Sequence, residues 1–360
     1  MAHPLQLARE ACETMIRHFE APMLKPVGHF HYHQGVFLSG MLKIWKLTGD
    51  DRYFDYARAW IDSVFDAEGR IKNCTFSNLD DIQPGILLFP ILDKTGDPYY
   101  RKCLDSVAEE VEAIRRNPEG GFWHAVNLTD QMWLDGLYMA GPFIAEYGAR
   151  FGRPEWLQDD IHQALLMQKN TLDEKTGLLC HAWDGRREMP WCDPDTGKSH
   201  EFWGRSMGWV PVALLDELRW IPEDMPGRQE VADMACSLLR HLIPFQGPDG
   251  RWFQVVNKGD QPGNWPENSC TSLYVAALCR AIRTGLLPAD LTEAAVRGFE
   301  GVAASLERDG DDLLIGQVCI GTGVGDYDFY CARPCSVNDL HGVGAFLLMC
   351  AELAELQAEA

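Results

Sequence analysis

Short turn segments of similar sequence recur along the first half of the chain, each between two stretches with helical spacing of apolar residues. Thr48–Tyr53 and Thr95–Tyr100 share the order Thr-Gly-Asp-x-x-Tyr, and Phe151–Trp156 occupies the same place in a third pair. In each turn a glycine lies where one helix should end, and an acidic residue or proline lies where the next should begin. This repeat predicts a fold built by stacking helical hairpins.

The spacing of apolar residues predicts helices along the whole chain, with no linker or low-complexity segment between them. We therefore expect one domain over residues 1–360 that consists of six hairpins. The twelve predicted helices cover residues 5–20, 34–48, 52–66, 80–93, 97–116, 132–150, 154–170, 204–219, 228–244, 268–284, 290–306 and 338–357.

The two helices of a predicted hairpin differ in how their apolar residues are distributed. The second is amphipathic, as in Arg52–Phe65 and Tyr100–Ile114, whereas the first is apolar or small nearly all round, as in Trp133–Tyr147 and Cys270–Ala281. A helix that is apolar on every side is buried. Six buried helices inside six amphipathic ones predict an all-α, double-layered (α/α)6 barrel. An open solenoid is the alternative, and the chain length favours closure.

The segments that lead into the buried helices are long and rich in glycine, tryptophan and histidine. They include Gly120–His124, Gly177–Asp184, Gly250–Gln254 and Gly321–Tyr330, and some of them are expected to form short strands. Long loops of this kind usually carry function. In a barrel all of them emerge at the same end, where we expect the site to lie, with long loops around it.

Charge and cysteine usage limit the classes of partner and the compartment. The net charge of −21 argues against nucleic acid or an anionic membrane as a partner. No apolar run is long enough to span a membrane, and Met1–Leu5 lacks the basic and apolar start of a secretory signal. Five of the twelve cysteines lie in apolar helical patterns, which is typical of reduced thiols: Cys12, Cys103, Cys236, Cys279 and Cys350. We therefore expect a cytoplasmic protein.

Two acidic positions at the starts of predicted buried helices are candidates for acid/base chemistry. Asp135 lies within an apolar and aromatic segment, and burying an ionised carboxylate there is costly unless it is paired or protonated. A carboxyl with a raised pKa is what a proton donor at neutral pH needs. A second charge from the acidic pair Asp80–Asp81 is expected to raise the pKa of Asp135 further and to couple the two titrations. The alternative is that Asp135 only caps a helix.

The motifs around these residues resemble those of a known family, the unsaturated glycuronyl hydrolases. The resemblance is strongest to the unsaturated rhamnogalacturonyl hydrolase group, glycoside hydrolase family 105, which is related to family 88. It covers nearly the whole chain, and its most specific blocks are Trp-Leu-Asp-Gly-Leu-Tyr-Met at 133–139 and Trp-Gly-Arg-x-x-Gly-Trp at 203–209. The segments that carry it are Asn78–Gly85, Gly121–His124, Gln131–Phe143, Phe202–Trp209 and Asn338–Gly344.

The resemblance implies an (α/α)6 barrel and an unusual reaction. Such enzymes act on oligosaccharides left by polysaccharide lyases, which carry a 4,5-unsaturated uronic acid at the non-reducing end. They hydrate this double bond and do not attack the anomeric carbon. By resemblance, Asp135 protonates C4 and then takes a proton from the water that adds at C5. Asp80 is implied as its partner or as a ligand of a substrate hydroxyl, and Asp81 is expected to have a capping role.

Other residues around the expected site are candidates for substrate binding. Arg205 can hold a carboxylate in two hydrogen bonds, and the alternative is a structural arginine stacked on tryptophan. By resemblance, His124 and His181 line the subsite for the unsaturated sugar. Trp133, Trp203 and Trp209 are expected to stack on sugar faces, together with some of Trp123, Trp183 and Trp265, although several tryptophans must belong to the core.

The run His29–His33 has the alternating histidines of a metal site, but no nearby carboxylate in the sequence completes a familiar ligand set. We therefore predict no metal and no cofactor. Tyr32 and His33 are instead expected at the rim of the pocket, where the first buried helix, Gln34–Leu47, begins. His341 begins the sixth buried helix and is expected either to line the site or to pack structurally.

Alternative functions remain for a chain with this architecture. The same barrel hosts inverting glycosidases, polysaccharide lyases and sugar isomerases. A non-enzymatic helical scaffold is disfavoured because it needs no crowded tryptophan and histidine loops at one end. The long Arg186–His200 loop is expected to shape the subsite of the second sugar, and the pattern leaves rhamnose, galacturonate and a glycosaminoglycan unit open.

Overall fold

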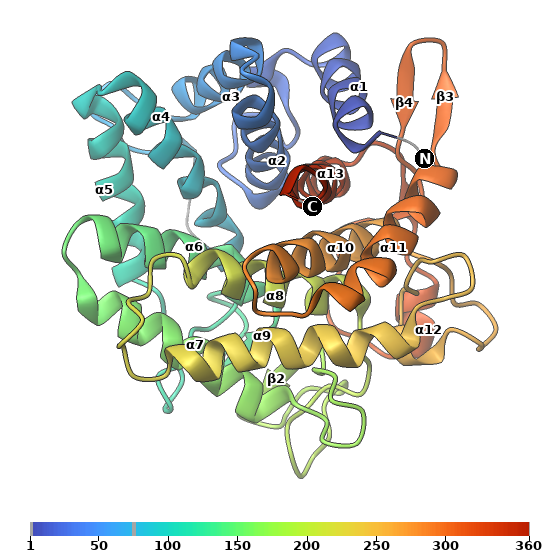
Figure 1. The fold of residues 1–360 in the computed structure, drawn as a ribbon. Helices are drawn as coiled ribbons and strands as arrows, with labels where there is room; N and C mark the ends of the chain where they lie inside the picture. Colours follow the sequence, from blue (N-terminus) through green and yellow to red (C-terminus); the bar gives the residue numbers. More distant parts are fainter. Residues whose placement is uncertain (1–2, 74–76, 360) are drawn as a thin grey trace.

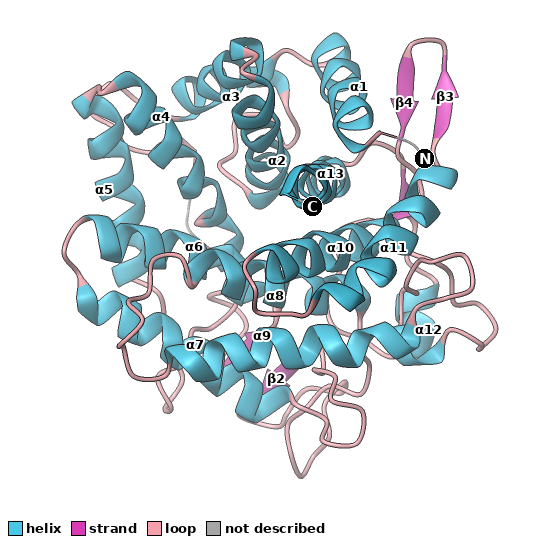
Figure 2. Ribbon diagram, in the orientation of Figure 1, coloured by secondary structure: helices cyan, strands magenta, loops and turns pink. Residues whose placement is uncertain are grey.

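The computed structural model describes residues 3–73 and 77–359, which form two concentric layers of helices (Figures 1 and 2). The inner layer consists of α2 (Tyr32–Thr48), α4 (Leu88–Thr95), α6 (Asp135–Arg150), α8 (Gly204–Glu217), α10 (Asn268–Arg283) and α13 (Leu340–Glu359). The outer layer consists of α1 (Pro4–His18), α3 (Asp51–Val64), α5 (Pro98–Glu112), α7 (Pro154–Thr171), α9 (Arg228–Leu242) and α11 (Thr292–Ala304). A helix lies in each of the twelve predicted segments, although the predicted helix 80–93 is divided and several others differ at their ends.

The inner helices close into a ring. Going round it, α2 and α6 both pack on the 3-10 segment η3 (Gln83–Leu87), which continues into α4, and α6 packs on α8, α8 on α10, and α10 on α13. Helix α13 then packs on α2, and Figure 1 shows α13 nearly end-on between α2 and α10. The predicted barrel is therefore confirmed, and the open solenoid is excluded.

Each inner helix has one outer partner, and the sixth pair joins the two ends of the described chain. Helices α2 and α3, α4 and α5, α6 and α7, α8 and α9, and α10 and α11 pack as hairpins of consecutive elements. Helix α1 packs on α13, so the outer helix that comes first in the chain covers the inner helix that comes last. This pairing completes the outer layer.

The recurring turns have the geometry that their sequence predicts. Gly49 and Gly96 adopt left-handed backbone conformations with φ of 68° and 65°, which glycine tolerates without strain. Their amides donate to the carbonyls of Trp45 and Leu92, each at 2.8 Å, and so satisfy the ends of α2 and α4. Asp50 then caps α3 by accepting from the amide of Arg52.

The ends of two inner helices differ from the prediction. The segment 80–93 is divided into η2 (Leu79–Asp81), η3 and α4, because Pro84 has no amide hydrogen to continue a regular helix. Residues 132 and 133 of the predicted helix 132–150 belong instead to β1 (Gln131–Trp133), which pairs with β2 (Ala182–Asp184). Helix α6 therefore begins at Asp135.

The remaining strands and short helices belong to the loops. Strands β3 (Glu307–Asp309) and β4 (Asp312–Leu314) form a hairpin beside α1, visible at the upper right of Figure 2. Strands β5 (Val318–Cys319) and β6 (Cys335–Ser336) pair near the start of α13. Helix α12 (Tyr327–Cys331) forms within the predicted Gly321–Tyr330 loop. The short 3-10 turns outside the inner layer are Ala21–Met23, Ile243–Phe245, Val256–Lys258 and Ala289–Leu291.

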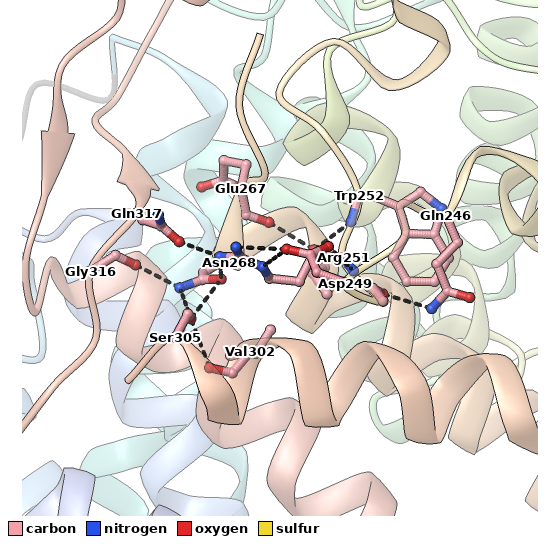
Figure 3. Close-up of polar contacts among 12 residues, drawn as sticks. Gln246, Asp249, Arg251, Trp252, Glu267, Asn268, Val302, Ser305, Gly316 and Gln317 are labelled. Carbon is pink, nitrogen blue, oxygen red and sulfur yellow. Dashed lines mark hydrogen bonds and ion pairs between the residues drawn. The ribbon is translucent and has the colours of Figure 1, made fainter. Parts of the chain in front are cut away.

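A polar network holds the loop before β5 against the start of α10 (Figure 3). Asn268 donates to the carbonyl of Gly316 at 2.8 Å and to the hydroxyl of Ser305, at the end of α11, at 3.0 Å. Its own side-chain oxygen accepts from Arg251 at 3.0 Å, and Arg251 also donates to Gln317. The network fixes β5, which in turn contacts the candidate site.

Candidate active site

The predicted site residues gather at the end of the barrel where the inner helices begin. Tyr32, Asp135 and Arg205 lie at the first or second positions of α2, α6 and α8, and His341 is the second residue of α13. Asp80 lies in η2, just before η3 and α4. Because the inner helices run in the same direction, these starts meet at one mouth, as the sequence predicts.

Backbone hydrogen bonds between the loops place Asp135 beside His181. In the β1–β2 pair, Trp133 lies opposite Ala182, and the amide of Leu134 donates to the carbonyl of His181 at 3.0 Å. The β1–β2 pairing therefore places Asp135, the first residue of α6, next to the loop that contains His181. The N-cap of α6 is Leu134, and the carboxylate of Asp135 points to His181, so capping is not the role of Asp135.

Asp135, His181 and Tyr330 form a hydrogen-bonded chain. His181 Nε2 lies 3.1 Å from Asp135 Oδ2, and His181 Nδ1 lies 2.6 Å from the hydroxyl of Tyr330. An ionised carboxylate only accepts, so Nε2 donates to Asp135, and Nδ1 accepts from Tyr330. The amide of Gly325 donates to the same hydroxyl at 3.3 Å. Because the His181 ring is fully buried, solvent does not compete for these bonds.

The two candidate carboxyls have pKa values that move in opposite directions. Burial raises the pKa of Asp80 well above its usual range, and the charges of Asp135 and Asp81 raise it further. Burial also opposes ionisation of Asp135, but the hydrogen bond from His181 and the positive charge of Arg205 lower its pKa overall. Two carboxyls with divergent pKa values are a common basis for acid/base chemistry.

This result corrects the expectation that Asp135 holds the proton. The sequence shows an apolar setting for Asp135, but it does not show the histidine that donates to its carboxylate. In the protein without substrate, Asp80 is the carboxyl that favours the protonated form, and Asp135 favours the ionised form. Asp80 Oδ2 also lies 3.8 Å from His31 Nε2.

Asp81 has a structural role close to the expected one. Its side chain is buried, and its carboxylate accepts from the amide of Ser77 at 3.2 Å. It therefore binds the backbone of the loop that precedes η2, whereas capping of a helix start was expected. The neighbouring amide of Leu79 donates to the carbonyl of His124 at 2.9 Å, which ties the Asp80 segment to the loop before β1.

Arg205 is a buried cation held by backbone carbonyls. One of its nitrogens donates to the carbonyl of Ile320 at 2.8 Å, and another donates to that of Cys319. Its guanidinium also lies 4.5 Å from the ring centroid of Trp203. The stacked arginine of the structural alternative is therefore present. Among the described residues, no carboxylate lies within 4 Å of it, so its charge is not neutralised by an ion pair.

His124 and Trp133 form a stacked pair beside His181. Their ring centroids lie 4.5 Å apart with an interplanar angle of 10°, and the Trp133 ring meets His181 edge-on at 5.6 Å. Trp133 is only half-buried, so part of its ring faces the mouth. Burial lowers the pKa of His124 to about 4, so this ring is neutral at physiological pH.

Trp203 and Trp209 lie behind the mouth. Trp203 is 1% exposed and packs between His181 and Tyr330, with centroid distances of 4.7 and 5.9 Å. Trp209 is also 1% exposed and stacks on Tyr138 at 4.5 Å inside the barrel. Both rings therefore have packing roles here, and the structure does not place them where a sugar would stack. The Trp-Gly-Arg-x-x-Gly-Trp motif alone does not distinguish a tryptophan that packs inside the barrel from one that stacks on a sugar.

Tyr32, His33 and His341 form an aromatic group on the opposite side of the mouth. Tyr32 is 8% exposed, and its ring centroid lies 6.0 Å from that of fully buried His341. Burial raises the pKa of Tyr32 strongly. The expectation that no carboxylate lies near these histidines is wrong, because Asp339 Oδ1 is 3.8 Å from His33 Nε2 and 2.8 Å from His341 Nδ1. Asp339 is 306 residues from His33, so sequence proximity could not reveal the contact.

The Arg186–His200 loop and the Gly321–Tyr330 segment border the exposed side of Trp133. Trp191 of the first and Val324 of the second belong to one small apolar cluster with Trp133. A cavity of about 630 Å³ lies on the other side, between α1, residues 24–33 and residues 337–340. His31 and His33 line this cavity, which places it beside the mouth.

The closed double ring of helices, with an acidic pair and aromatic loops at one mouth, is the architecture of α/α-barrel enzymes that act on carbohydrates. Comparison with known families makes the assignment specific. The family model of Glycosyl Hydrolase Family 88 matches residues 7–357, so this chain belongs to that family.

Individual relatives agree with this assignment. A family 105 glycoside hydrolase of C. acetobutylicum ATCC 824 has a similar structure, with a TM-score of 0.90 and 30% identity over 96% of this chain and 98% of that chain. Protein Atu3128 of Agrobacterium fabrum is 34% identical over 59% of this chain and 97% of its own length. The unsaturated rhamnogalacturonyl hydrolase YesR of Bacillus subtilis is 24% identical over 81% of this chain and 79% of its own length. The resemblance noted from the sequence is confirmed.

None of the helices in residues 3–73 and 77–359 combines the length and the apolar character that crossing a membrane requires.

Proposed function

We propose that this protein is a glycoside hydrolase that removes a 4,5-unsaturated uronic acid from the non-reducing end of oligosaccharides made by polysaccharide lyases. Membership of family 88 and the named activity of the Bacillus subtilis relative support the substrate class. The observation that carries the chemistry is the pair of carboxyls at the mouth, Asp80 with a raised pKa and Asp135 with a lowered one.

The proposed reaction is hydration of the C4–C5 double bond. A carboxyl delivers a proton to C4, and the oxygen of a water molecule bonds to C5. This water keeps one hydrogen as the new hydroxyl group and gives its second proton to a carboxylate. The product is a hemiketal at C5. It collapses with cleavage of the bond between C5 and the ring oxygen, and the resulting hemiacetal at C1 releases the remaining sugar as an alcohol. Water is the only co-reactant, and the carboxyls return to their initial protonation state.

Asp135 is proposed as the acid and base of this reaction, with Asp80 as its partner. Before substrate binds, the proton of the pair is held by Asp80, as the two pKa directions indicate. The carboxylate of the incoming uronate adds negative charge near Asp135, and a like charge raises a carboxyl pKa. Substrate binding is therefore expected to shift the proton towards Asp135. His181 keeps the carboxylate oriented through its 3.1 Å contact.

Positive groups at the mouth support an anionic substrate despite the net charge of −21. Arg205 is a buried cation without an ion-pair partner within 4 Å among the described residues. The inner helices also begin at this end, and a helix N-terminus carries a partial positive charge that stabilises anions. Arg205 is thus proposed as a fixed charge that attracts the uronate carboxylate, and its contacts with two carbonyls keep it in place.

Rhamnose is the proposed sugar next to the unsaturated uronate. The Bacillus subtilis relative is named for rhamnogalacturonyl substrates, and an Alteromonas relative, 22% identical over 49% of this chain and 42% of its own length, is named an unsaturated 3S-rhamnoglycuronyl hydrolase. The Arg186–His200 loop, which packs beside Trp133 through Trp191, is proposed to contact this second sugar.

A cytoplasmic location is proposed on the basis of the cysteines. Eleven cysteines within the described residues are free thiols, and eight of them are buried in the barrel and its loops. Free thiols in such number are typical of reducing compartments. Nucleic acid is not proposed as a partner, because the negative net charge opposes binding to phosphates.

The test is loss of ultraviolet absorbance on a panel of lyase-digested oligosaccharides from rhamnogalacturonan, homogalacturonan and glycosaminoglycans. The conjugated enol ether absorbs, and hydration destroys it. We expect absorbance to fall fastest with the rhamnogalacturonan disaccharide and not to fall with Asp135→Asn. A folded protein that releases a sugar while absorbance is retained would act as an ordinary inverting glycosidase, and one that changes only a saturated sugar would act as an isomerase.

A further inference from the structure

Three side chains beside the mouth bring one potential metal ligand each to the same place. His33, Asp339 and His341 each offer one ligand atom, and these three atoms all lie within 4.8 Å of one another. Asp339 Oδ1 is 2.8 Å from His341 Nδ1 and 3.8 Å from His33 Nε2. In a tetrahedral site with metal–ligand bonds of 2.0–2.1 Å, ligand atoms lie about 3.3 Å apart, a value between these two distances.

The hydrogen bonds behind His341 and Asp339 determine which atom each side chain presents. His341 Nε2 lies 3.0 Å from the carbonyl of Cys319, and because a carbonyl only accepts, Nε2 carries the ring hydrogen. In the neutral ring the lone pair is then on Nδ1. This nitrogen is buried and has no well-aligned hydrogen-bond partner among the described residues, although it faces Asp339. Ser336 donates to the other oxygen of Asp339 at 3.1 Å.

His33 has a corresponding arrangement. Its Nδ1 lies 3.0 Å from Nδ1 of His31, and the two rings stack with an angle of 17°. When His33 donates in this contact, its Nε2 presents a lone pair towards Asp339. Each of the three side chains thus has its other polar atom held by a neighbour. Such outer hydrogen bonds orient histidines and carboxylates that bind metals.

The geometry points to a site for one divalent transition-metal ion, with His33, Asp339 and His341 as its three protein ligands. Two imidazole lone pairs and a carboxylate oxygen that face one another repel unless a cation or proton lies among them. Imidazole ligands favour ions such as Zn²⁺ over Mg²⁺ and Ca²⁺, which prefer all-oxygen sites. This inference replaces the earlier prediction of no metal, which assumed that no carboxylate was near the histidines.

The site has room for a ligand that the protein does not supply. His33 and Asp339 both line the cavity of about 630 Å³, so a fourth coordination position faces this cavity. Water or a sugar oxygen fills such a position in sites with three protein ligands. The inference does not depend on the proposed hydration reaction, and no step of that reaction is assigned to the ion.

The test is direct metal binding to the tag-free, reduced protein after dialysis against a chelator. We expect calorimetry with ZnCl₂ to give one site per chain, and Co²⁺ to give visible absorption bands without an intense thiolate charge-transfer band. Asp339→Asn and His33→Gln should each weaken Zn²⁺ binding at least tenfold. His18→Asn is the matched control, because His18 is an exposed histidine that also lies beside a carboxylate, that of Asp312.

The outcomes distinguish a metal site from a charged pair. If the folded wild type binds no Zn²⁺, or if Asp339→Asn and His33→Gln bind it as well as His18→Asn does, then His341 and Asp339 form a simple protonated pair and the inference is wrong. A thiolate band with Co²⁺ would place the ion on cysteines and also overturn it. Circular dichroism identifies a misfolded variant, and the partly exposed His33 allows a second substitution, His33→Asn.

Discussion

At the scale of single residues, the hydrogen bonds around His181 decide how easily Asp135 ionises. Tyr330 donates to Nδ1 of His181, and His181 donates to Asp135 through Nε2. Loss of the tyrosine hydroxyl frees the imidazole to turn or to change tautomer, and a weaker donor to the carboxylate raises the carboxyl pKa. Tyr330 therefore acts on the reaction through His181, as a positioning residue.

Tyr330→Phe is expected to move the acid limb of the kcat/KM profile to higher pH. The profile of the free enzyme should require ionised Asp135 and protonated Asp80, so its acid limb reports the pKa of Asp135. The measurement is the rate of absorbance loss from pH 4 to 9. Tyr327→Phe is the control, since Tyr327 lies on the same helix but its hydroxyl donates to the carbonyl of Pro262. An unshifted profile would contradict the proposed chain.

Asp135→Asn should lower kcat about 10²–10⁴-fold or more, the usual contribution of a general acid or base, while leaving the fold intact. The amide keeps the shape of the carboxylate but can neither deliver nor accept the proton. Absorbance assays and thermal unfolding are the two measurements. Activity within a few-fold of the wild type would remove Asp135 from the acid/base role.

The positions of the site residues could be predicted from the sequence better than their contacts. Asp80, Asp135 and Arg205 begin buried helical segments, and such starts meet at one end of a barrel. Which groups touch them depends on loops whose folded paths leave no local pattern. Tyr330 and His181 are 149 residues apart, and their hydrogen bond decides the ionisation of a carboxyl on a third segment.

At the scale of elements, the seam between α2 and α13 depends on the absence of a side chain at Gly344. A Cβ at this position would lie 2.5 Å from the backbone carbon and oxygen of Val36. Gly344→Ala is therefore expected to destabilise the protein by about 1–3 kcal/mol, the usual cost of overpacking. Urea unfolding measures it. Gly316→Ala is the control, because a Cβ there would meet only a methyl group of Val337, at 3.8 Å. Equal urea midpoints for the two variants would show that α2 and α13 shift to make room for the added methyl group and would contradict the prediction.

Regular elements follow from local signals, and irregular ones do not. The helix pairs and their Thr-Gly-Asp turns were predictable because caps and apolar spacing act within a few residues. The β1–β2 ladder was not, since Trp133 pairs with Ala182 on a distant loop and competes with the helical pattern of its own segment. In the sequence, Pro84 is the only sign that the predicted helix 80–93 is divided. How strongly this proline disrupts the helix depends on how the segment packs against α2.

At the scale of the whole molecule, the net charge of −21 repels an anionic substrate over long distances. Salt screens this repulsion, because the Debye length shortens from about 30 Å at 0.01 M to about 8 Å at 0.15 M. We expect kcat/KM for the unsaturated disaccharide to rise over this range, with kcat nearly unchanged. A fall in kcat/KM would mean that the local field of Arg205 and the helix starts dominates the approach of the substrate.

A buried acidic pair makes the stability of the barrel depend on pH. The carboxyls of Asp160 and Glu217 lie together over Gly141, and burial, followed by neighbouring negative charges, raises both pKa values. An acid whose pKa is raised by folding stabilises the native state at low pH, and this contribution is lost as pH rises through the folded pKa. Glu217→Gln should therefore gain stability relative to the wild type as pH rises from 5 to 8.

Urea unfolding of the wild type and Glu217→Gln at several pH values measures this difference. Glu223→Gln, which changes an exposed acid, is the matched control and should follow the wild type. A constant difference between Glu217→Gln and the wild type across this pH range would contradict a raised pKa for the pair.

The contact of α13 with α2 and α1 also has a consequence for synthesis on the ribosome. Helix α2 (residues 32–48) packs on α13 (residues 340–359), so one side of α2 stays uncovered until α13 has been synthesised. Nearly all of the described chain must therefore leave the exit tunnel before the ring can close. Until then the nascent chain resembles an unfinished solenoid with an apolar edge, a state that chaperones shield and that aggregates easily. The mouth of the barrel is also completed late in synthesis, because His341 lies in α13 and Asp339 directly precedes it.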